Sequence, residues 1–65
     1  MPKVKKYTKK SAYYAERLRG KGYSVRFNWV DEDSYEDVTV RGPVFNGYGR
    51  EFNTSKEAWD YINER

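Results

Sequence analysis

The stretch YSVRFNWV, residues 23–30, gives the clearest secondary-structure signal in the chain. Its apolar side chains recur at every second position, a period that is typical of a strand buried on one face. The positions on the buried side are Tyr23, Val25, Phe27 and Trp29. The positions between them are Ser24, Arg26, Asn28 and Val30. We therefore predict a strand that presents an aromatic ladder to the core.

The segment that follows this strand is strongly acidic. DEDSYED, residues 31–37, interrupts the apolar pattern and predicts a loop. A second strand is expected over residues 37–41, with Val38 and Val40 facing the core. The Asp31 and Asp33 carboxylates have the spacing that begins a calcium loop, but the glycine and the glutamate that such a loop needs later are missing. We interpret the segment as a solvated turn.

The turn that leads into the third strand has two possible positions. Asn46-Gly47 is a pair that a type I′ turn prefers, because both residues tolerate positive φ. In that case Val44 and Phe45 extend the second strand, and the third strand covers residues 48–53. A turn at Gly42-Pro43 would instead begin the third strand at Val44. We favour Asn46-Gly47.

A helix is predicted on the N-terminal side of the sheet. Thr8 is a suitable N-cap, the helix ends near Arg19, and Gly20 suits the left-handed residue that follows many helices. The face expected to pack on the sheet consists of Ser11, Tyr14, Ala15 and Leu18.

A second helix is predicted at the C-terminal end. TSKE, residues 54–57, matches a capping box in which Thr54 accepts from the Glu57 amide and the Glu57 carboxylate reaches back to the Thr54 amide. About ten helical residues follow. Their buried stripe is expected to be Ala58, Trp59 and Ile62.

Together these elements predict an α+β fold of order α-β-β-β-α, in which a three-stranded antiparallel sheet carries both helices on one face. The 65 residues suffice for one small domain, and residues 1–7 are expected to form a flexible basic arm. The chain has no Cys and no His, so disulfides and ordinary zinc sites are excluded. Twelve aromatic side chains can supply the core instead.

Catalysis is not expected from this composition. His is the commonest general base and Cys the most reactive nucleophile, and both are absent. Gly47-Tyr48-Gly49 lacks the further glycine and the Lys-Ser/Thr pair of a phosphate-binding loop. We expect neither a metal nor a cofactor. There is no run of apolar residues that would cross a bilayer and no secretory signal, so a cytoplasmic protein without membrane contacts is expected.

The charge is distributed unevenly along the chain. Residues 1–30 carry nine basic groups and one acid, a net +8, whereas residues 31–65 carry four basic groups and nine acids, a net −5, which gives the overall +3. A basic segment of this kind favours an anionic partner. We therefore predict a small, non-enzymatic nucleic-acid-binding domain that mainly contacts phosphates.

The residues predicted to contact nucleic acid form two groups. A stripe with helical spacing along the N-terminal arm and helix combines basic groups with one ring that can stack on a base. Its members and close neighbours are Lys6, Lys9, Lys10, Tyr13, Arg17 and Lys21. Arg26 and Arg41, and also Arg50, are expected on the uncovered face of the sheet, where Arg and Asn side chains can read base edges.

The alternative function is a protein-binding module, such as a small inhibitor or adaptor of a larger enzyme. It would use a free strand edge, the charged surfaces or exposed aromatic residues. Tyr35 and Phe45 have no secure core position, so they are expected at the rim of the core or in an aromatic patch. The chain would be a monomer, or a dimer paired through an open sheet edge.

Two family patterns resemble parts of this sequence. The element order, with Gly47-Tyr48-Gly49 before residues 54–58, is similar to double-stranded RNA-binding domains, but only Lys56 keeps a lysine where that family grips phosphates. Residues 50–54, with Glu57 and Ala58, resemble the end of the three-stranded DNA-binding domain of some integrases. Both resemblances imply nucleic-acid binding, and we assign the chain to neither family.

Overall fold

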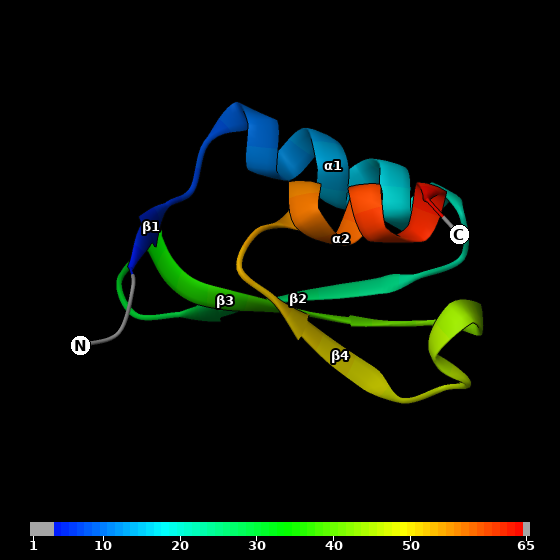
Figure 1. Cartoon of the computed structure of the whole chain (residues 1–65). Coiled ribbons are helices and arrows are strands. Elements are labelled where there is room, and N and C mark those ends of the chain that lie inside the picture. The colour runs from blue at the N-terminus through cyan, green and yellow to red at the C-terminus, as the bar shows by residue number, and fades with distance from the viewer. Residues whose placement is uncertain (1–3, 65) are drawn as a thin grey trace.

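A computed structural model describes residues 4–64 of the chain. Its elements, in order, are β1 (Lys5–Lys6), α1 (Lys9–Gly20), β2 (Ser24–Trp29), β3 (Ser34–Arg41), the 3₁₀ turn η1 (Pro43–Phe45), β4 (Gly49–Phe52) and α2 (Ser55–Asn63). The α+β class is confirmed, and both helices lie on one face of the antiparallel sheet (Figure 1). The sheet has four strands rather than three, because part of the predicted flexible arm forms β1. Residues 1–3 of that arm lie outside the described residues.

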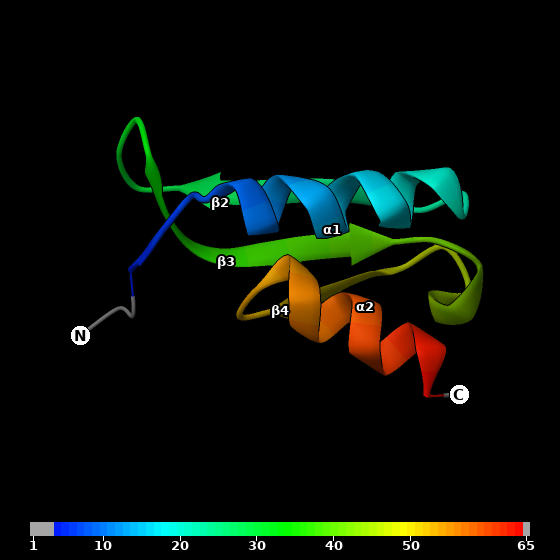
Figure 2. The same cartoon turned by 90° about the horizontal axis from the view of Figure 1, so that it is seen from above.

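β3 is the central strand of the sheet. It pairs antiparallel with β2 along one side, and with β1 and β4 along the other side. Tyr35 lies opposite both Lys5 and Trp29, and Val38 lies opposite both Phe27 and Phe52. Seen from above, α1 lies over β2 and β3, and α2 lies over the β4 side (Figure 2). Within residues 4–64, β2 has a strand partner on one side only.

A β-bulge changes the alternation of β3. Asn28 pairs with Asp37 and Trp29 with Tyr35, so Glu36 is an extra residue on β3. As a result, Tyr35 faces the same side as Val38 although three positions separate them, and both are buried. The predicted loop over 31–37 is therefore too long, since β3 already begins at Ser34.

The ends of α1 show how local sequence limits the helix. Thr8 is the N-cap as predicted, and its hydroxyl accepts from the Ser11 amide at 3.3 Å. At the other end Gly20 is still helical, and Gly22, with φ of 94°, takes the left-handed conformation predicted for Gly20. The Gly22 amide donates to the Arg19 carbonyl at 3.1 Å, and the next amide donates to the Leu18 carbonyl. These two bonds form a Schellman motif that turns the chain into β2.

α2 begins at the predicted N-cap. The Thr54 hydroxyl accepts from the Glu57 amide at 3.2 Å. In the described part of the chain, the Glu57 carboxylate does not make the predicted return bond to the Thr54 amide. The helix extends over nine residues, and Ala58 and Ile62 are buried as predicted, whereas Trp59 is only half-buried.

The connection between β3 and β4 contains both predicted breaks. Asn46 and Gly47 have φ of 53° and 85°, and the Tyr48 amide donates to the Phe45 carbonyl at 2.9 Å. This confirms the turn at Asn46-Gly47. Pro43–Phe45 forms a 3₁₀ turn, so the prediction that Val44 and Phe45 continue the second strand is wrong. Proline supplies no amide for a strand ladder, which favours this change.

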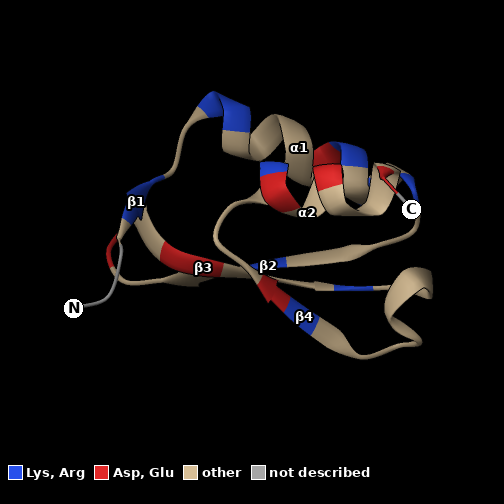
Figure 3. Cartoon of the chain, in the orientation of Figure 1, with Lys and Arg blue, Asp and Glu red and all other residues tan. Residues whose placement is uncertain are grey.

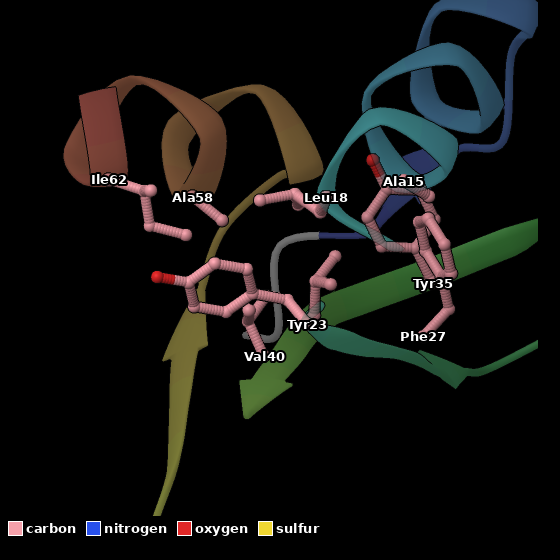
Figure 4. Packing of buried hydrophobic residues seen from close by; sticks show 9 residues of the cluster. Ala15, Leu18, Tyr23, Phe27, Tyr35, Val40, Ala58 and Ile62 are labelled. Atoms are coloured by element: carbon pink, nitrogen blue, oxygen red, sulfur yellow. The ribbon is translucent and has the colours of Figure 1, made fainter. Parts of the chain in front are cut away.

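The core lies between the sheet and the two helices (Figure 4). Its fully buried side chains include Leu18 from α1, Val38 and Val40 from β3, and Ala58 from α2. Tyr35, which we placed at the rim, is only 1% exposed and belongs to this core. The reason is the bulge, which turns its ring toward the helices.

Three other side chains differ from or refine the predicted burial. Trp29 lies in the ring cluster beneath the start of α1 but is 50% exposed, because it stands at the end of β2. Tyr14, predicted to be buried, is only half-buried. Phe45 packs partly buried against the core and stacks on Tyr61 with ring centroids 5.9 Å apart.

Candidate nucleic-acid interface

The two helices run side by side in the same direction, so that their N-terminal ends lie at the same end of the molecule (Figures 1 and 2). The Ser55 hydroxyl of α2 donates to the Ser11 carbonyl of α1 at 2.9 Å, and both serines are buried. This bond fixes the first turns of the helices against each other. The N-terminal ends of the two helices therefore form one continuous surface.

Cationic and aromatic side chains meet where α1 faces α2. The guanidinium of Arg17 and the ammonium of Lys21 each lie 4.9 Å from the ring centroid of Trp59. Lys21 also donates to the side-chain oxygen of Asn63 at 3.1 Å, and Arg17 lies 5.6 Å from the ring centroid of Tyr13. Cation–π contacts of this kind restrain long basic side chains without cancelling their charge. We name these five residues the cation–aromatic row.

The N-terminal ends of the helices and β1 enclose a hollow of about 260 Å³. Four lysines line it, and the remaining lining side chains all carry hydroxyls. The lining residues are Lys5, Lys6, Lys10, Lys56, Thr8, Ser11, Tyr14, Tyr35, Thr54 and Ser55. We name it the lysine hollow. Its lining includes no carboxylate, and the positive ends of two helix dipoles lie beside it, so its electrostatic potential favours an anion.

The lysines of this hollow differ in their contacts. Lys10 forms no ion pair in the structure as described, whereas the Lys6 ammonium lies 3.9 Å from an Asp33 carboxylate in an exposed pair. Lys5 donates to the Glu36 carbonyl at 2.6 Å. The charge of Lys10 is therefore available to a ligand, and that of Lys6 is nearly as available, because an exposed and long ion pair is weak.

Lys56 projects from the first turn of α2. Its ammonium donates to the Asp60 carboxylate at 2.8 Å, one helical turn away. This hydrogen bond, supported by the charge of Asp60, raises the pKa of Lys56 above its ordinary value. The side chain is therefore cationic throughout the physiological range.

The structure separates the predicted binding residues into groups. The exposed side chains of α1 and of its C-cap lie on the helix layer, and they include Lys9, Lys10, Tyr13, Arg17 and Lys21. Lys6 does not continue their helical stripe, because it belongs to β1 and instead reaches the lysine hollow. The chain turns between β1 and the Thr8 N-cap, which is why helical spacing fails at this residue.

Arg26 and Arg41 lie elsewhere. Both alternate with core residues of β2 and β3, so they project from the sheet face opposite the helices. Arg50, which we also expected on that face, lies opposite Val40 on the helix side, and its guanidinium is 4.5 Å from the ring centroid of Tyr61. The structure does not bring these arginines together with the basic residues of α1.

The uncovered sheet face has little net charge. Arg26 and Arg41 share it with Asp37 and Glu51, because Asn28 pairs with Asp37 and Thr39 pairs with Glu51. The Asn28 amide donates to Asp37 and, at 3.2 Å, to Thr39. Its donors are engaged inside the sheet, so this face is poorly suited to read base edges.

Acidic groups gather on the opposite side of α2. A hollow of about 550 Å³ between β4 and α2 is lined by five carboxylates and one guanidinium. These residues are Asp37, Glu51, Glu57, Asp60, Glu64 and Arg50. Figure 3 shows the red segments of β4 and α2 and the blue segments of β1 and early α1. Between residues 4 and 64, no group of three or more carboxylates could hold a metal ion.

The sequence analysis did not include Trp59, Lys56 and Lys5 among the candidate binding residues. Lys56 is the second residue of α2, and the first turn of a helix is a known anion-binding position. Trp59 was assigned to the core stripe. Only the side-by-side arrangement of the helices shows that these residues adjoin α1.

Comparisons with protein families, curated proteins and solved structures find no match to this chain in any of the three. In the described residues, both helices are too short and too polar to cross a bilayer.

Proposed function

We propose that this protein is a non-enzymatic nucleic-acid-binding domain whose helix layer contacts the phosphate backbone. The proposal rests on one observation: the lysine hollow and the cation–aromatic row lie on the same pair of helices. The surface begins at the helix N-termini and continues along the facing sides of the two helices as far as Lys21 and Asn63. Its partner would be a DNA or RNA strand or duplex.

The chemistry of the surface supports binding to a polyanion. Lysine and arginine contacts to phosphates release counterions, which makes the affinity strongly dependent on salt. Tyr13 is 52% exposed, whereas Trp59 is half-buried, so the ring of Tyr13 is available to stack on a base or a sugar. Contacts to phosphates carry no sequence information, so we expect little sequence preference.

The first test measures binding of a fluorescent duplex and of a single strand by fluorescence anisotropy. Salt is varied between about 50 and 200 mM, a range over which 4–6 phosphate contacts should cost roughly two to three orders of magnitude in affinity. If neither nucleic acid binds at about 50 mM salt, the proposal is wrong.

The second test compares two double variants with the same change in charge. Lys10→Gln with Arg17→Gln removes two charges from the helix layer, whereas Arg26→Gln with Arg41→Gln removes two from the opposite sheet face. We expect the helix variant to lose at least tenfold in affinity and to show a smaller salt slope. The sheet variant should bind nearly as well as the unchanged protein. Equal losses would indicate that only net charge matters and would contradict a defined helical surface.

A further inference from the structure

The outer edge of β2 is an unpaired strand edge. β2 pairs only with β3 among the described strands. The Val30 amide donates to the Ser34 carbonyl of β3, so alternation turns the backbone groups of Asn28 and Arg26 toward β3. The backbone groups of Phe27 then point away from the sheet, as do those of its neighbours two positions away on either side. Such an edge is a template for a further strand.

Aromatic side chains line one end of this edge. Tyr7 lies with its ring centroid 5.1 Å from those of both Phe27 and Trp29, and the last two rings stack at 5.5 Å. Trp29 is 50% exposed and Val30 is 49% exposed. At this end of the edge, Tyr7, Trp29 and Val30 therefore form an exposed apolar patch rather than isolated apolar residues.

Arginines line the other end. The Arg19 guanidinium donates to the Val25 carbonyl at 3.2 Å, which agrees with an outward-pointing carbonyl at this residue. Arg26 projects from the same strand onto the uncovered face of the sheet. The edge and both sets of side chains form one hollow of about 560 Å³, lined by Tyr7, Arg19, Val25, Arg26, Phe27, Asn28 and Trp29. This lining contains two guanidiniums and no carboxylate.

We propose that the outer edge of β2 binds an extended peptide segment of a partner protein, paired antiparallel to β2, with apolar residues followed by acidic ones. Backbone bonds to Phe27 would hold the segment as an added strand, and side-chain contacts would select it. Complementarity of charge identifies the occupant. Arg19 and Arg26 lie beside the first half of β2, where the C-terminal part of an antiparallel segment would lie, so that part should be acidic. This surface is separate from the helix-layer interface and does not depend on it.

The register of the segment follows from strand geometry. Peptide side chains opposite Trp29 and Phe27 face the helix side and contact the aromatic cluster, so they should be apolar. The side chain opposite Arg26 faces the uncovered side of the sheet and should be acidic. The side chain opposite Val25 meets Arg19 and should also be acidic. A peptide core of sequence VTIEE, read antiparallel to β2, satisfies these conditions. Its Val lies opposite Trp29, its Ile opposite Phe27, and its two Glu residues opposite Arg26 and Val25.

The probe is the synthetic peptide acetyl-SVTIEES-amide, titrated into the isotope-labelled full chain to about 5 mM, which detects millimolar affinity. Amide chemical shifts are followed by NMR. We expect the changes to concentrate at Phe27, Asn28 and Trp29. If no amide of β2 shifts, or if the shifts lie only on α1 and α2, the proposal is wrong.

Charge swapping tests the arginine contacts. A peptide with lysine in place of both glutamates should bind about tenfold more weakly, because two attractive pairs become repulsive. Arg26→Glu should weaken binding of the original peptide and strengthen binding of the lysine peptide. Arg41→Glu, on β3 and on the same sheet face, makes the same charge change away from the edge and should have little effect. Equal binding of both peptides would overturn the charge assignment.

The oligomeric state in the absence of peptide provides a last test. Light scattering should show a monomer whose Phe27 amide exchanges rapidly with solvent. A dimer in which that amide is protected would refute the proposal, because a second copy of the chain would then occupy the edge.

Discussion

Gly42→Ala is predicted to be among the most damaging small substitutions in this chain. A Cβ at residue 42 would lie 2.2 Å from Cδ2 and 2.7 Å from Cε2 of the Tyr23 ring, whereas carbon atoms in contact are normally about 3.5–4.0 Å apart. The Tyr23 ring is only 7% exposed and packs against Phe45. It can relieve the clash only by displacing the core. The backbone at residue 42 is extended, so the whole cost comes from this contact.

The expected loss in the free energy of unfolding is about 3 kcal/mol, at the upper end of overpacking effects. This is a large part of the total stability of a chain of this length, which is roughly 3–10 kcal/mol. The same loss should lower the melting temperature by about 12–24 °C. Urea unfolding followed by tryptophan fluorescence measures the loss. A loss below about 0.5 kcal/mol would refute the reasoning.

Two matched variants isolate the cause of this loss. Gly20 has no heavy atom within 4 Å of an added Cβ and lies in the last turn of α1. Gly20→Ala should therefore stabilise the protein by about 0.4–1 kcal/mol. In a Tyr23→Leu background, Gly42→Ala should cost less than it does alone, because the smaller side chain leaves room for the methyl group. Strict additivity of the two changes would contradict a direct clash.

Three further predictions concern single contacts. Thr54→Ala removes the N-cap bond of α2 and should lower the free energy of unfolding by about 1 kcal/mol in urea denaturation, whereas Thr54→Ser should restore most of it. Tyr35→Phe removes a buried hydroxyl 3.3 Å from the Ser11 hydroxyl and should cost about 0.5–1.5 kcal/mol by the same assay; an unchanged midpoint would show that this contact contributes nothing. NMR titration should place the pKa of Lys56 above that of an ordinary lysine, and Asp60→Asn should lower it. Because the pKa of Lys56 is raised in the folded state, its contribution to the free energy of unfolding is complete below pH 10.5 and is lost as the pH rises through the folded-state pKa. If Asp60→Asn left the pKa of Lys56 unchanged, Asp60 would be excluded as the cause of the shift.

Local patterns predicted the elements well where a residue's neighbours in sequence determine its conformation. Thr8, Thr54 and the Asn46-Gly47 turn act through bonds that span only a few residues, and all three were found where expected. The bulge at Glu36 could not be predicted in this way. It exists only when β3 pairs with β2, and it turns toward the core the side chain of Tyr35, which we had expected in a loop.

The candidate site shows the same division. The basic character of α1 is visible in sequence, but the site depends on what lies beside it. The ring of Trp59 contacts Arg17 and Lys21, which precede it by about 40 positions in the sequence. Lys56 and Lys10 line the same hollow. Sequence spacing carries no information about such neighbours, because they are brought together only by the packing of α2 against α1.

The position of β3 also determines how the molecule should open. It is the one described strand with neighbours on both sides, and its valines Val38 and Val40 are completely buried. β1, by contrast, is held by two residue pairs at the end of the sheet. In hydrogen-exchange experiments, the amides of β3 should therefore exchange only through global unfolding, while those of β1 exchange through local opening. The slowest amides of β3 then provide a direct measure of the stability of the whole domain.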